Sequence, residues 1–371
     1  MNKDQLYQEH LDLMFGTTTL ENLSESIVDD IITRIIDFLP NNGKLYKYRS
    51  IEGESFDYAY DGLKNGYLYM ARANTLNDDF DSTLNFDAEK DANKQMELFL
   101  EKPWLYLEAL VRENCKQRQI FSSPYDKKAY QMLMSCVNNE SYELDREKAI
   151  NVFSQIGIDR QTSENYINKV LETVENEIRN NAEDLKKPLS ALINFNNESR
   201  KDIYIFSMSE AYDSDTMWAY YANSNKGFCV EYDYDKVKDL PFKKKLLISL
   251  YKVVYKDNFD EYSFSDMLQY YLGGKKDDKL LKRANMQTLT CMITKLSRWK
   301  EEKEWRIFLF NLDEKNKIFA DIVSGLILDE RIMSSENGIK LLNLAKEKNW
   351  SVTIRKRTRI GTGHLYEEYS T

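Results

Sequence analysis

The segment RWKEEKEWRIF, residues 298–308, shows how a polar stretch of this chain turns into a buried strand. Side chains of a β-strand alternate between its two faces, so a strand from Glu304 to Phe310 places Glu304 and Arg306 on the same face. Glu302 falls on that face as well if the alternation extends back to it. A charge beside buried surface needs a partner. The segment therefore predicts either a structural Glu304–Arg306 pair or a carboxylate held at the edge of a cleft.

Apolar patterns on both sides of this segment predict the rest of a sheet. We expect further strands at residues 45–49, 67–72, 203–209, 227–232, 246–255, 318–328 and 352–360, and helices at 23–39 and 335–347. Between residues 88 and 200 helix formers dominate, and one apolar helical face is marked by Ile167, Val170, Leu171, Val174 and Ile178. The pattern predicts an α+β fold, with a mixed or antiparallel sheet core and a large helical insertion.

These changes between strand-like and helix-like sequence divide the chain into four parts. Residues 1–43 form an N-terminal helical segment, 44–87 the first part of the core, 88–200 the insertion, and 201–371 the second part of the core. We expect the insertion to serve shape, self-association or the binding of a partner protein.

The composition excludes several classes of function and site. The chain has 371 residues and a net charge of −9, so it lacks a global attraction for nucleic acid, which could bind only locally as a substrate. The N-terminus is polar, no apolar run is long enough to span a bilayer, and the four cysteines form no CxxC pair, which predicts a cytoplasmic protein. With two histidines, His10 and His364, neither a zinc site nor a His-dependent triad is expected.

Two further segments carry polar and aromatic side chains together. In KLYKYRS, residues 44–50, Arg49 ends a strand and could clamp a phosphate, or pair with a surface acid. In MWAYYANSNKGFCVEYD, residues 217–233, aromatic side chains surround a turn in which we expect Gly227 to adopt a positive φ. Such an aromatic wall could hold a flat ring, although a hydrophobic plug that closes the sheet is the alternative for Trp218.

Two charged stretches remain open to more than one interpretation. The loop Asn77–Asp81 carries three carboxylates that could bind a metal, but such loops more often cap helices and form Asx turns. Arg355, Arg357 and Arg359 share one face of the last expected strand. They could contact phosphates, or they could protect an edge strand from aggregation.

Taken together, the motifs MWAYYANSNKGFCVEYD and WKEEKEWRI resemble a bacterial family called domain of unknown function 2971 (DUF2971). The resemblance covers about residues 45–87 and 203–330. The family usually has a proline where this chain has Asp79, which puts a rigid acidic loop in doubt. The family name implies no established activity, and the resemblance points to phage defence or a stress response.

A second resemblance, to ADP-ribosyltransferase-like folds, suggests a chemistry and a split sheet. It is carried by the order of Arg49, the expected strand 67–72, and Glu304 before an Ile-rich strand. It implies an NAD-using transferase or NAD glycohydrolase with Glu304 and Glu302 as catalytic groups. The cofactor would be NAD, without a metal, held by Arg49, Tyr48, Tyr69, Trp218, Tyr221, Lys226 and Arg306. Transition-state stabilisation by a carboxylate needs neither histidine nor metal.

Two other functions stay open at this point. One is a non-enzymatic ligand-binding or sensor module that uses the aromatic turn. The other is a metal-dependent nuclease that uses Asp78, Asp81 and Glu304, against which the acidic net charge argues.

Overall fold

The structure, a computed structural model, describes residues 3–15, 24–76, 78, 81–83, 85, 87–112, 124–138, 141–180, 200–240, 247–263, 278–310, 316–358 and 363–369. Its contacts divide the chain into two units. The first comprises Met1–Thr83, Asn197–Phe259 and Thr290–Thr371, and the second comprises Leu84–Asn196 and Asp260–Leu289. Within the described ranges, no helix is both long and apolar enough to cross a membrane.

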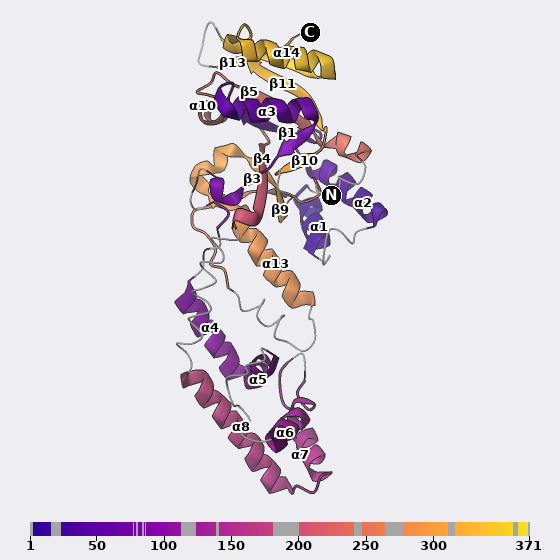
Figure 1. The fold of residues 1–371 in the computed structure, drawn as a ribbon, viewed down its shortest axis with the longest axis vertical. Coiled ribbons are helices and arrows are strands. Elements are labelled where there is room, and N and C mark those ends of the chain that lie inside the picture. The colour runs from indigo at the N-terminus through magenta and orange to yellow at the C-terminus, as the bar shows by residue number, and fades with distance from the viewer. Residues whose placement is uncertain are drawn as a thin grey trace. The chain divides into compact units, whose positions relative to one another are not determined.

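The first unit is built on a nine-stranded sheet in the order β13-β12-β11-β5-β1-β4-β9-β6, with β3 also paired to β4 (Figure 1). The strands are β1 (Lys44–Arg49), β3 (Ala71–Arg72), β4 (Ile203–Ser209), β5 (Phe228–Asp233), β6 (Leu250–Lys252), β9 (Glu304–Phe310), β11 (Val323–Asp329), β12 (Ser351–Arg357) and β13 (His364–Glu368). Within this sheet β11 and β12 pair parallel and the other described pairs are antiparallel. The predicted α+β class with a mixed, mostly antiparallel sheet is confirmed.

Three expected strands are interrupted, because their halves pair with different partners. Two small sheets take the other halves: β2 (Tyr67–Tyr69) pairs with β10 (Lys317–Phe319), and β7 (Val254–Lys256) with β8 (Thr294–Leu296). The breaks fall where single backbone N–H groups bond elsewhere, for example from Met70 to the Asn316 carbonyl and from Val253 to the Glu304 carbonyl. The predictions of single strands over 67–72, 246–255 and 318–328 were therefore wrong, because each range contains two separate strands.

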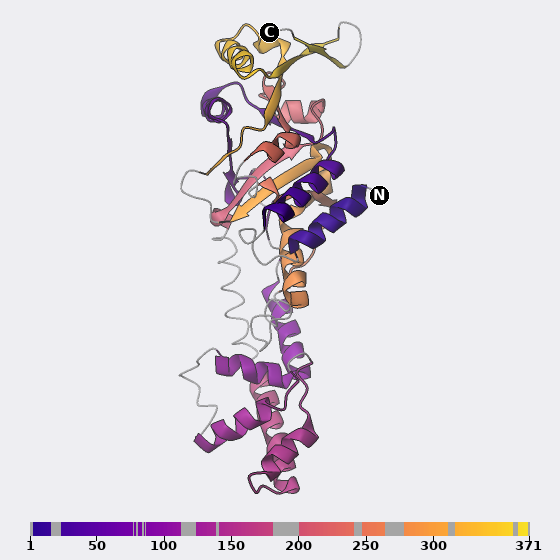
Figure 2. The same cartoon turned by 90° about the vertical axis from the view of Figure 1, so that its right-hand side faces the viewer.

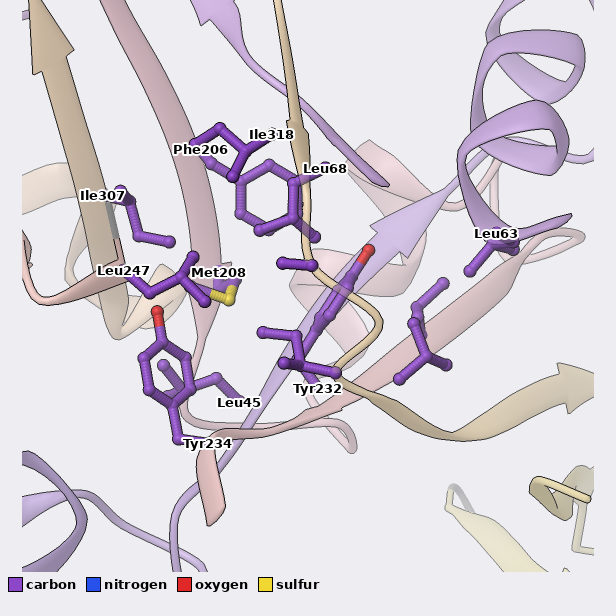
Figure 3. Packing of buried hydrophobic residues seen from close by; sticks show 14 of the residues in the cluster. Leu45, Leu63, Leu68, Phe206, Met208, Tyr232, Tyr234, Leu247, Ile307 and Ile318 are labelled. Atoms are coloured by element: carbon purple, nitrogen blue, oxygen red, sulfur yellow. The ribbon is translucent and has the colours of Figure 1, made fainter. Parts of the chain in front are cut away.

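Helices cover both faces of the sheet (Figure 2). They are α1 (Lys3–Phe15), α2 (Glu25–Phe38), α3 (Gly53–Asn65), α10 (Asp215–Tyr221) and α14 (Glu336–Lys348), with 3₁₀ turns η2 (Ala73–Thr75), η3 (Arg200–Asp202), η4 (Tyr234–Asp239), η5 (Ser297–Glu302) and η6 (Glu330–Ile332). Buried side chains of α2, α3 and α14 share one large apolar core with the sheet. Figure 3 shows part of it, where Leu63 of α3 lies near Leu68 and Tyr232. The opposite face receives α10, whose Trp218 packs on Tyr48.

The sequence explains where these helices begin and end. Ser24 caps α2 by accepting a hydrogen bond from the backbone N–H of Ile27, and Pro40 follows the helix closely. At the other end of the chain, Ser335 caps α14 and Asn349 closes it in the left-handed conformation, with φ of 56°. The helices expected at 23–39 and 335–347 are confirmed as α2 and α14.

Gly227 has a different role from the one that the sequence suggests. Positive φ angles in this turn belong to Asn223, Ser224 and Asn225. A Cβ atom on Gly227 would lie 2.3 Å from the backbone oxygen of Arg49 and 2.8 Å from the backbone carbon of Ala222. Glycine is needed here because two backbone segments approach closely, so the expected positive φ at Gly227 was wrong.

The second unit is helical where it is described. It contains α4 (Ala88–Glu101), α5 (Pro103–Arg112), α6 (Pro124–Met134), α7 (Arg146–Ser154), α8 (Arg160–Asn180) and most of α13 (Asp278–Ile293). The apolar face expected on α8 is present, with Ile167, Val174 and Ile178 buried in a second core. Residues 260–263 and 278–289, which the sequence places in the second part of the core, belong to this unit. Lys90 pairs with Glu261, and Ser263 donates a hydrogen bond of 2.6 Å to Asp91.

The close approach at Gly227 predicts a steric cost. We expect Gly227→Ala to lower the free energy of unfolding by about 1–3 kcal/mol, because the Arg49 and Ala222 backbones would have to move. Gly363→Ala is the matched control, since a Cβ there has no atom within 4 Å. Urea denaturation of the full chain measures both. Equal unfolding midpoints for the two variants would contradict the packing argument.

Candidate functional site

A cavity of about 180 Å³ lies on the sheet face that carries Tyr46 and Tyr48. Strands β1, with Lys47 among its residues, and β4 provide most of its wall, and α10, β8, η5 and β9 add one or two side chains each. Two carboxylates, Glu302 and Glu304, and the ammonium of Lys295 are part of its lining. The cavity therefore combines tyrosine rings with a group of charges.

Strand register explains why these residues meet. Between β1 and β4, which are both fully described, the ladder consists of one pair, Tyr46 with Ser209. Ser209 is paired in turn with Glu304 on β9, so the three side chains share one face of the sheet. Beyond that single pair the strands are joined by a side chain, since Lys47 Nζ donates to the Ser207 carbonyl. The cavity lies over this poorly paired junction.

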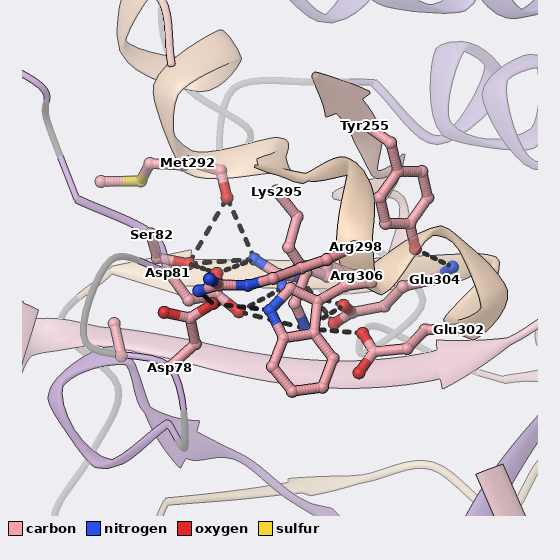
Figure 4. A network of polar contacts seen from close by, with 12 residues as sticks. Asp78, Asp81, Ser82, Tyr255, Met292, Lys295, Arg298, Glu302, Glu304 and Arg306 are labelled. Carbon is pink, nitrogen blue, oxygen red and sulfur yellow. Dashed lines mark hydrogen bonds and ion pairs between the residues drawn. The ribbon is translucent and has the colours of Figure 1, made fainter. Parts of the chain in front are cut away.

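Arg306 is the centre of the charged group (Figure 4). Its side chain is 1% exposed. Nε and Nη2 donate to the two Glu304 oxygens at 2.6 and 2.8 Å, while Nη1 and Nη2 donate to the two Asp81 oxygens at 2.5 and 2.7 Å. Nη1 also reaches Ser82 Oγ at 3.1 Å and the Met292 carbonyl at 3.2 Å. One guanidinium thus orients two carboxylates and joins β9 to the loop after β3.

Lys295 extends this group toward Glu302. Its Nζ lies 2.5 Å from Glu302 Oε2, 3.2 Å from Glu304 Oε2 and 3.5 Å from Asp81 Oδ2. The other Glu302 oxygen accepts a 2.6 Å hydrogen bond from the Tyr221 hydroxyl. With all five groups ionised, three carboxylates face two cations, so the group carries one net negative charge.

The two glutamates have opposite pKa shifts. Burial raises the pKa of Glu302, and the neighbouring charge of Glu304 raises it further, against Lys295 and the Tyr221 hydrogen bond. Burial alone would raise the pKa of Glu304 as well, but Arg306 and Lys295 together hold that pKa below its ordinary value. Glu304 is therefore fixed as an anion, whereas the surroundings of Glu302 favour its protonated form.

The chain brings Glu302 beside Glu304 by a turn, not by strand alternation. Glu302 ends η5, and Lys303 follows with φ of 44° in the left-handed region. The Glu302 carbonyl accepts a 2.7 Å hydrogen bond from Ser209 Oγ, which ties this turn to β4. Glu302 and Glu304 therefore face the same side, as expected, but a turn at Lys303 brings them together and not the alternation of a strand.

Four of the residues expected to hold a cofactor lie elsewhere. Arg49 is on the opposite face of β1, at a small space that Tyr232 also lines. Trp218 is fully buried and donates from Nε1 to the Tyr212 carbonyl at 2.8 Å, as expected for a hydrophobic plug that closes the sheet.

Tyr69 stacks on Tyr58 with 5.7 Å between ring centroids, away from the cavity. Lys226 is exposed in its turn and outside the cavity lining. Among the expected residues, the cavity thus gathers Tyr48, Tyr221, Glu302 and Glu304, with Arg306 bonded to Glu304.

The acidic loop and the last arginines have structural partners. Asp81 accepts from Arg306, and Asp78 accepts a 2.8 Å hydrogen bond from Trp299 Nε1. Asn77, Asp79 and Phe80 lie outside the described residues, as does Arg359.

Arg355 is fully buried, because β12 lies between β11 and β13 and is not an edge strand. Its guanidinium contacts Asp329 and Asp215 at 3.0 Å each. In the described ranges no three His, Cys, Asp or Glu side chains are arranged so that they could hold a metal ion.

Lys295 is the site residue that the sequence analysis missed. It lies on β8, between the buried Thr294 and the partly buried Leu296, and its side chain is 4% exposed. A lysine seven residues before Glu302 in an otherwise apolar run, CMITKL, was the available signal. A buried cation in such a run requires acidic partners.

Comparison with known families supports one of the two resemblances. Residues 217–307 match the family described as "Protein of unknown function (DUF2971)", so the DUF2971 resemblance is confirmed over that segment. The segment begins inside α10 and ends inside β9, and it includes Tyr221, Lys295, Glu302, Glu304 and Arg306. No curated protein and no solved structure matches the chain.

The opposite pKa shifts predict opposite effects of two isosteric substitutions. Folding lowers the pKa of Glu304, so its ionised form stabilises the fold fully above its ordinary pKa of 4.5 and less as the pH falls through the lowered value. We expect Glu304→Gln to lower the free energy of unfolding by about 2–3 kcal/mol at pH 7, because charge-assisted hydrogen bonds to Arg306 are lost. The deficit should shrink toward pH 3.

The matched variant is Glu302→Gln. Since folding raises the pKa of Glu302, ionising this group costs stability as the pH rises above 4.5. We expect the variant to unfold at the same urea concentration as the wild type at pH 7, or at a higher one. A loss as large as that of Glu304→Gln would refute the assignment of the two protonation states.

Proposed function

We propose that this protein is an enzyme that cleaves the N-glycosidic bond of a nucleotide, with NAD as the substrate, in the manner of ADP-ribosyltransferases and NAD glycohydrolases. The observation that carries the proposal is the pair of neighbouring carboxylates, Glu302 and Glu304, with pKa values shifted in opposite directions at one cavity. Titratable pairs whose environments separate their pKa values are typical of acid–base catalysis.

The proposed reaction needs only these residues, the substrate, and water or an acceptor hydroxyl. The bond from ribose C1′ to the nicotinamide nitrogen breaks, and its electron pair stays on that nitrogen, which becomes neutral. The positive charge that develops at C1′ is stabilised by the net negative charge of the Asp81, Lys295, Glu302, Glu304 and Arg306 group. Water or an acceptor hydroxyl then attacks C1′ and gives its proton to Glu302.

The size of the cavity suits one ring of such a substrate. A cavity of about 150 Å³ holds a benzene molecule, so the 180 Å³ observed here has room for a nicotinamide or ribose ring. Complete ligands of drug size need roughly 300–1,000 Å³, and the rest of a dinucleotide would have to lie outside. Tyr46, Tyr48 and Tyr221 supply the walls that a flat ring would contact.

The structure changes the roles first expected from the sequence. Glu304 has both oxygens bonded to Arg306, so it supports the site as a fixed charge, and Glu302 takes the catalytic role. Arg49, the expected pyrophosphate clamp, lies on the other face of the sheet and has no part in this proposal. The single-pair junction of β1 and β4 supports the analogy to a split sheet.

A non-catalytic ligand-binding module is the second candidate. One observation favours it: every charge of the group already has partners within the protein, as in a purely structural network. For the nuclease alternative, both Asp81 oxygens are bonded to Arg306, which leaves them poorly placed to hold a metal. A role in phage defence, a cytoplasmic location and self-association through residues 88–200 stay predictions.

Nicotinamide release from NAD by the purified full chain tests the proposal. We expect turnover by the wild type, a loss of at least about 100-fold in kcat for Glu302→Gln, and wild-type rates for Glu301→Gln. Glu301 is the adjacent, exposed glutamate and serves as the matched control. If the wild type releases no nicotinamide with water, protein or nucleic acid as acceptor but a nucleotide raises its melting temperature, the ligand-binding module replaces the enzyme.

The same assay predicts a pH profile. If Glu302 accepts the proton, activity requires its ionised form, so kcat/KM should rise with pH through a pKa above the ordinary 4.5. The variant Glu302→Gln should lack this ascending limb in any residual activity. A profile between pH 4 and 9 that is flat, or that falls in this range, would contradict the role of Glu302 as a base.

A further inference from the structure

A second pocket lies beside the carboxylate cavity on the same face of the sheet. Its volume is about 310 Å³, and it shares Tyr46 with that cavity. Strands β1, β5, β11, β12 and β13 line it, and Tyr212 adds a ring from the segment between β4 and α10. We call it the tyrosine pocket, after Tyr46, Tyr212 and Tyr366 in its lining. The pocket and the cavity are therefore neighbours, with Tyr46 between them.

Strand register places the tyrosine pocket and the carboxylate cavity in one row of side chains. Residues that pair directly on neighbouring strands face the same side of a sheet. From β9 to β12 the paired residues are Glu304, Ser209, Tyr46, Glu231, Gly325 and Ser351. Strands lie about 4.8 Å apart, so three steps put Glu231 on the order of 14 Å from Glu304. The two spaces are positioned to hold two parts of one ligand.

The tyrosine pocket is open because Gly325 has no side chain. Gly325 lies inside β11, where the register with β5 shifts between Val323 and Gly325. A Cβ on Gly325 would lie 2.4 Å from Ser351 Oγ and 3.4 Å from Glu231 Oε1. A glycine inside a strand often marks a close approach by a ligand, and strand irregularities are common next to active sites. The backbone at Gly325 is therefore suited to contact with a bound molecule.

Glu231 gives this pocket a fixed carboxylate. Its side chain is 14% exposed, and its Oε1 accepts from Lys44 Nζ at 2.7 Å and from Ser324 Oγ at 2.6 Å. Among the described residues, Oε2 meets only the Tyr46 hydroxyl, at 3.4 Å. A carboxylate oxygen has two acceptor positions. One oxygen of Glu231 thus holds the side chain in place, and the other is open to a donor on a ligand.

Aromatic rings form a wall of the pocket. The Tyr212 ring packs on Tyr46 with 5.2 Å between ring centroids, and on Tyr366 with 5.1 Å. These contacts fix the rings before any ligand binds. Tyrosine faces of this kind contact flat rings, and a nucleobase stacks on them whatever its sequence identity.

The charges of the pocket favour an uncharged ligand that donates hydrogen bonds. Besides the tyrosines, its ionisable lining side chains are Lys44, Glu231 and Glu368, so one cation faces two carboxylates. Lys44 is already paired with Glu231, and the carboxylate oxygens are the main groups left to bond a ligand. A phosphate is repelled by this net negative charge, whereas ribose hydroxyls donate to carboxylates. A ribonucleoside combines such hydroxyls with a flat ring.

We propose that the tyrosine pocket binds the adenosine half of the dinucleotide whose nicotinamide end enters the carboxylate cavity. The inference rests on the proposed cleavage of NAD, since a cavity of 180 Å³ leaves the second half of that substrate outside. The ribose hydroxyls donate to Glu231 Oε2, and the adenine ring lies against Tyr212 and Tyr366. The pocket, at 310 Å³, has the size of a small-molecule site.

Adenosine alone tests the pocket, because it lacks the bond that the cavity would cleave. Isothermal titration calorimetry of the full chain compares adenosine with 2′,3′-dideoxyadenosine, which has no hydroxyl to offer Glu231. We expect the wild type to bind adenosine about 10-fold more tightly than the dideoxy analogue. Glu231→Gln should weaken adenosine binding about 10-fold and remove the difference between the two ligands. Glu367→Gln, exposed on β13 and outside the pocket lining, should bind like the wild type.

Two results with the wild type overturn the proposal without any variant. One is the absence of adenosine binding. The other is equal affinity for adenosine and its dideoxy analogue, which would mean that the ribose does not contact Glu231.

NAD cleavage by a ring variant separates the pocket from the cavity. Tyr212→Leu should raise KM for NAD about 10-fold with little change in kcat, because the adenine ring loses a stacking partner. Tyr220→Leu removes a ring of α10 that is 71% exposed and outside the pocket, and it should leave KM unchanged. If NAD is cleaved and Tyr212→Leu keeps the wild-type KM, the pocket assignment fails and the cleavage stands. If NAD is not cleaved but adenosine binding depends on Glu231, the pocket stands and the cleavage fails.

Discussion

The buried guanidinium of Arg306 is the interaction on which the rest of this site depends. A cation that is 1% exposed is tolerated only if its donors are bonded and its charge is matched. Arg306 meets both conditions with Glu304 on its own strand and Asp81, 225 residues away. Once these carboxylates are fixed, Lys295 has a defined place between them and Glu302. The raised pKa of Glu302 follows from its burial and from the charge of Glu304, which Arg306 holds in place.

The sheet separates two environments that use the same strands. One face carries the large apolar core beneath α2, α3 and α14, and the other carries the tyrosines, the charged group and α10. Alternation along β9 places Trp305 and Ile307 in the core, and Glu304 and Arg306 at the cavity.

Much of the fold and of the site was predictable from the sequence, and the features that were not have physical causes. The alternation of EWRIF correctly placed Glu304 and Arg306 on one face, because that property is local to a strand. The position of Arg49 was not predictable, since the faces of β1 and β9 are related only through the register of Tyr46, Ser209 and Glu304. The breaks in the three interrupted strands were not predictable for the same reason. The pairing partners of a strand are distant in sequence, whereas an apolar run is a local pattern. Lys295 was missed because nothing near it in sequence reveals its three acidic neighbours.

The separation of Asp81 from Arg306 also has a consequence for how the chain is made. A ribosome adds roughly 5–20 residues per second, so Asp81 emerges on the order of ten to forty seconds before the arginine that neutralises it. Glu302 and Glu304 appear only shortly before Arg306, and the segments that meet at the site come from both ends of a long stretch of helix-forming sequence. During synthesis Asp81 therefore lacks its Arg306 partner until β9 has been added. The charged group is therefore complete only late in translation, and a chain truncated before residue 306 would lack it entirely.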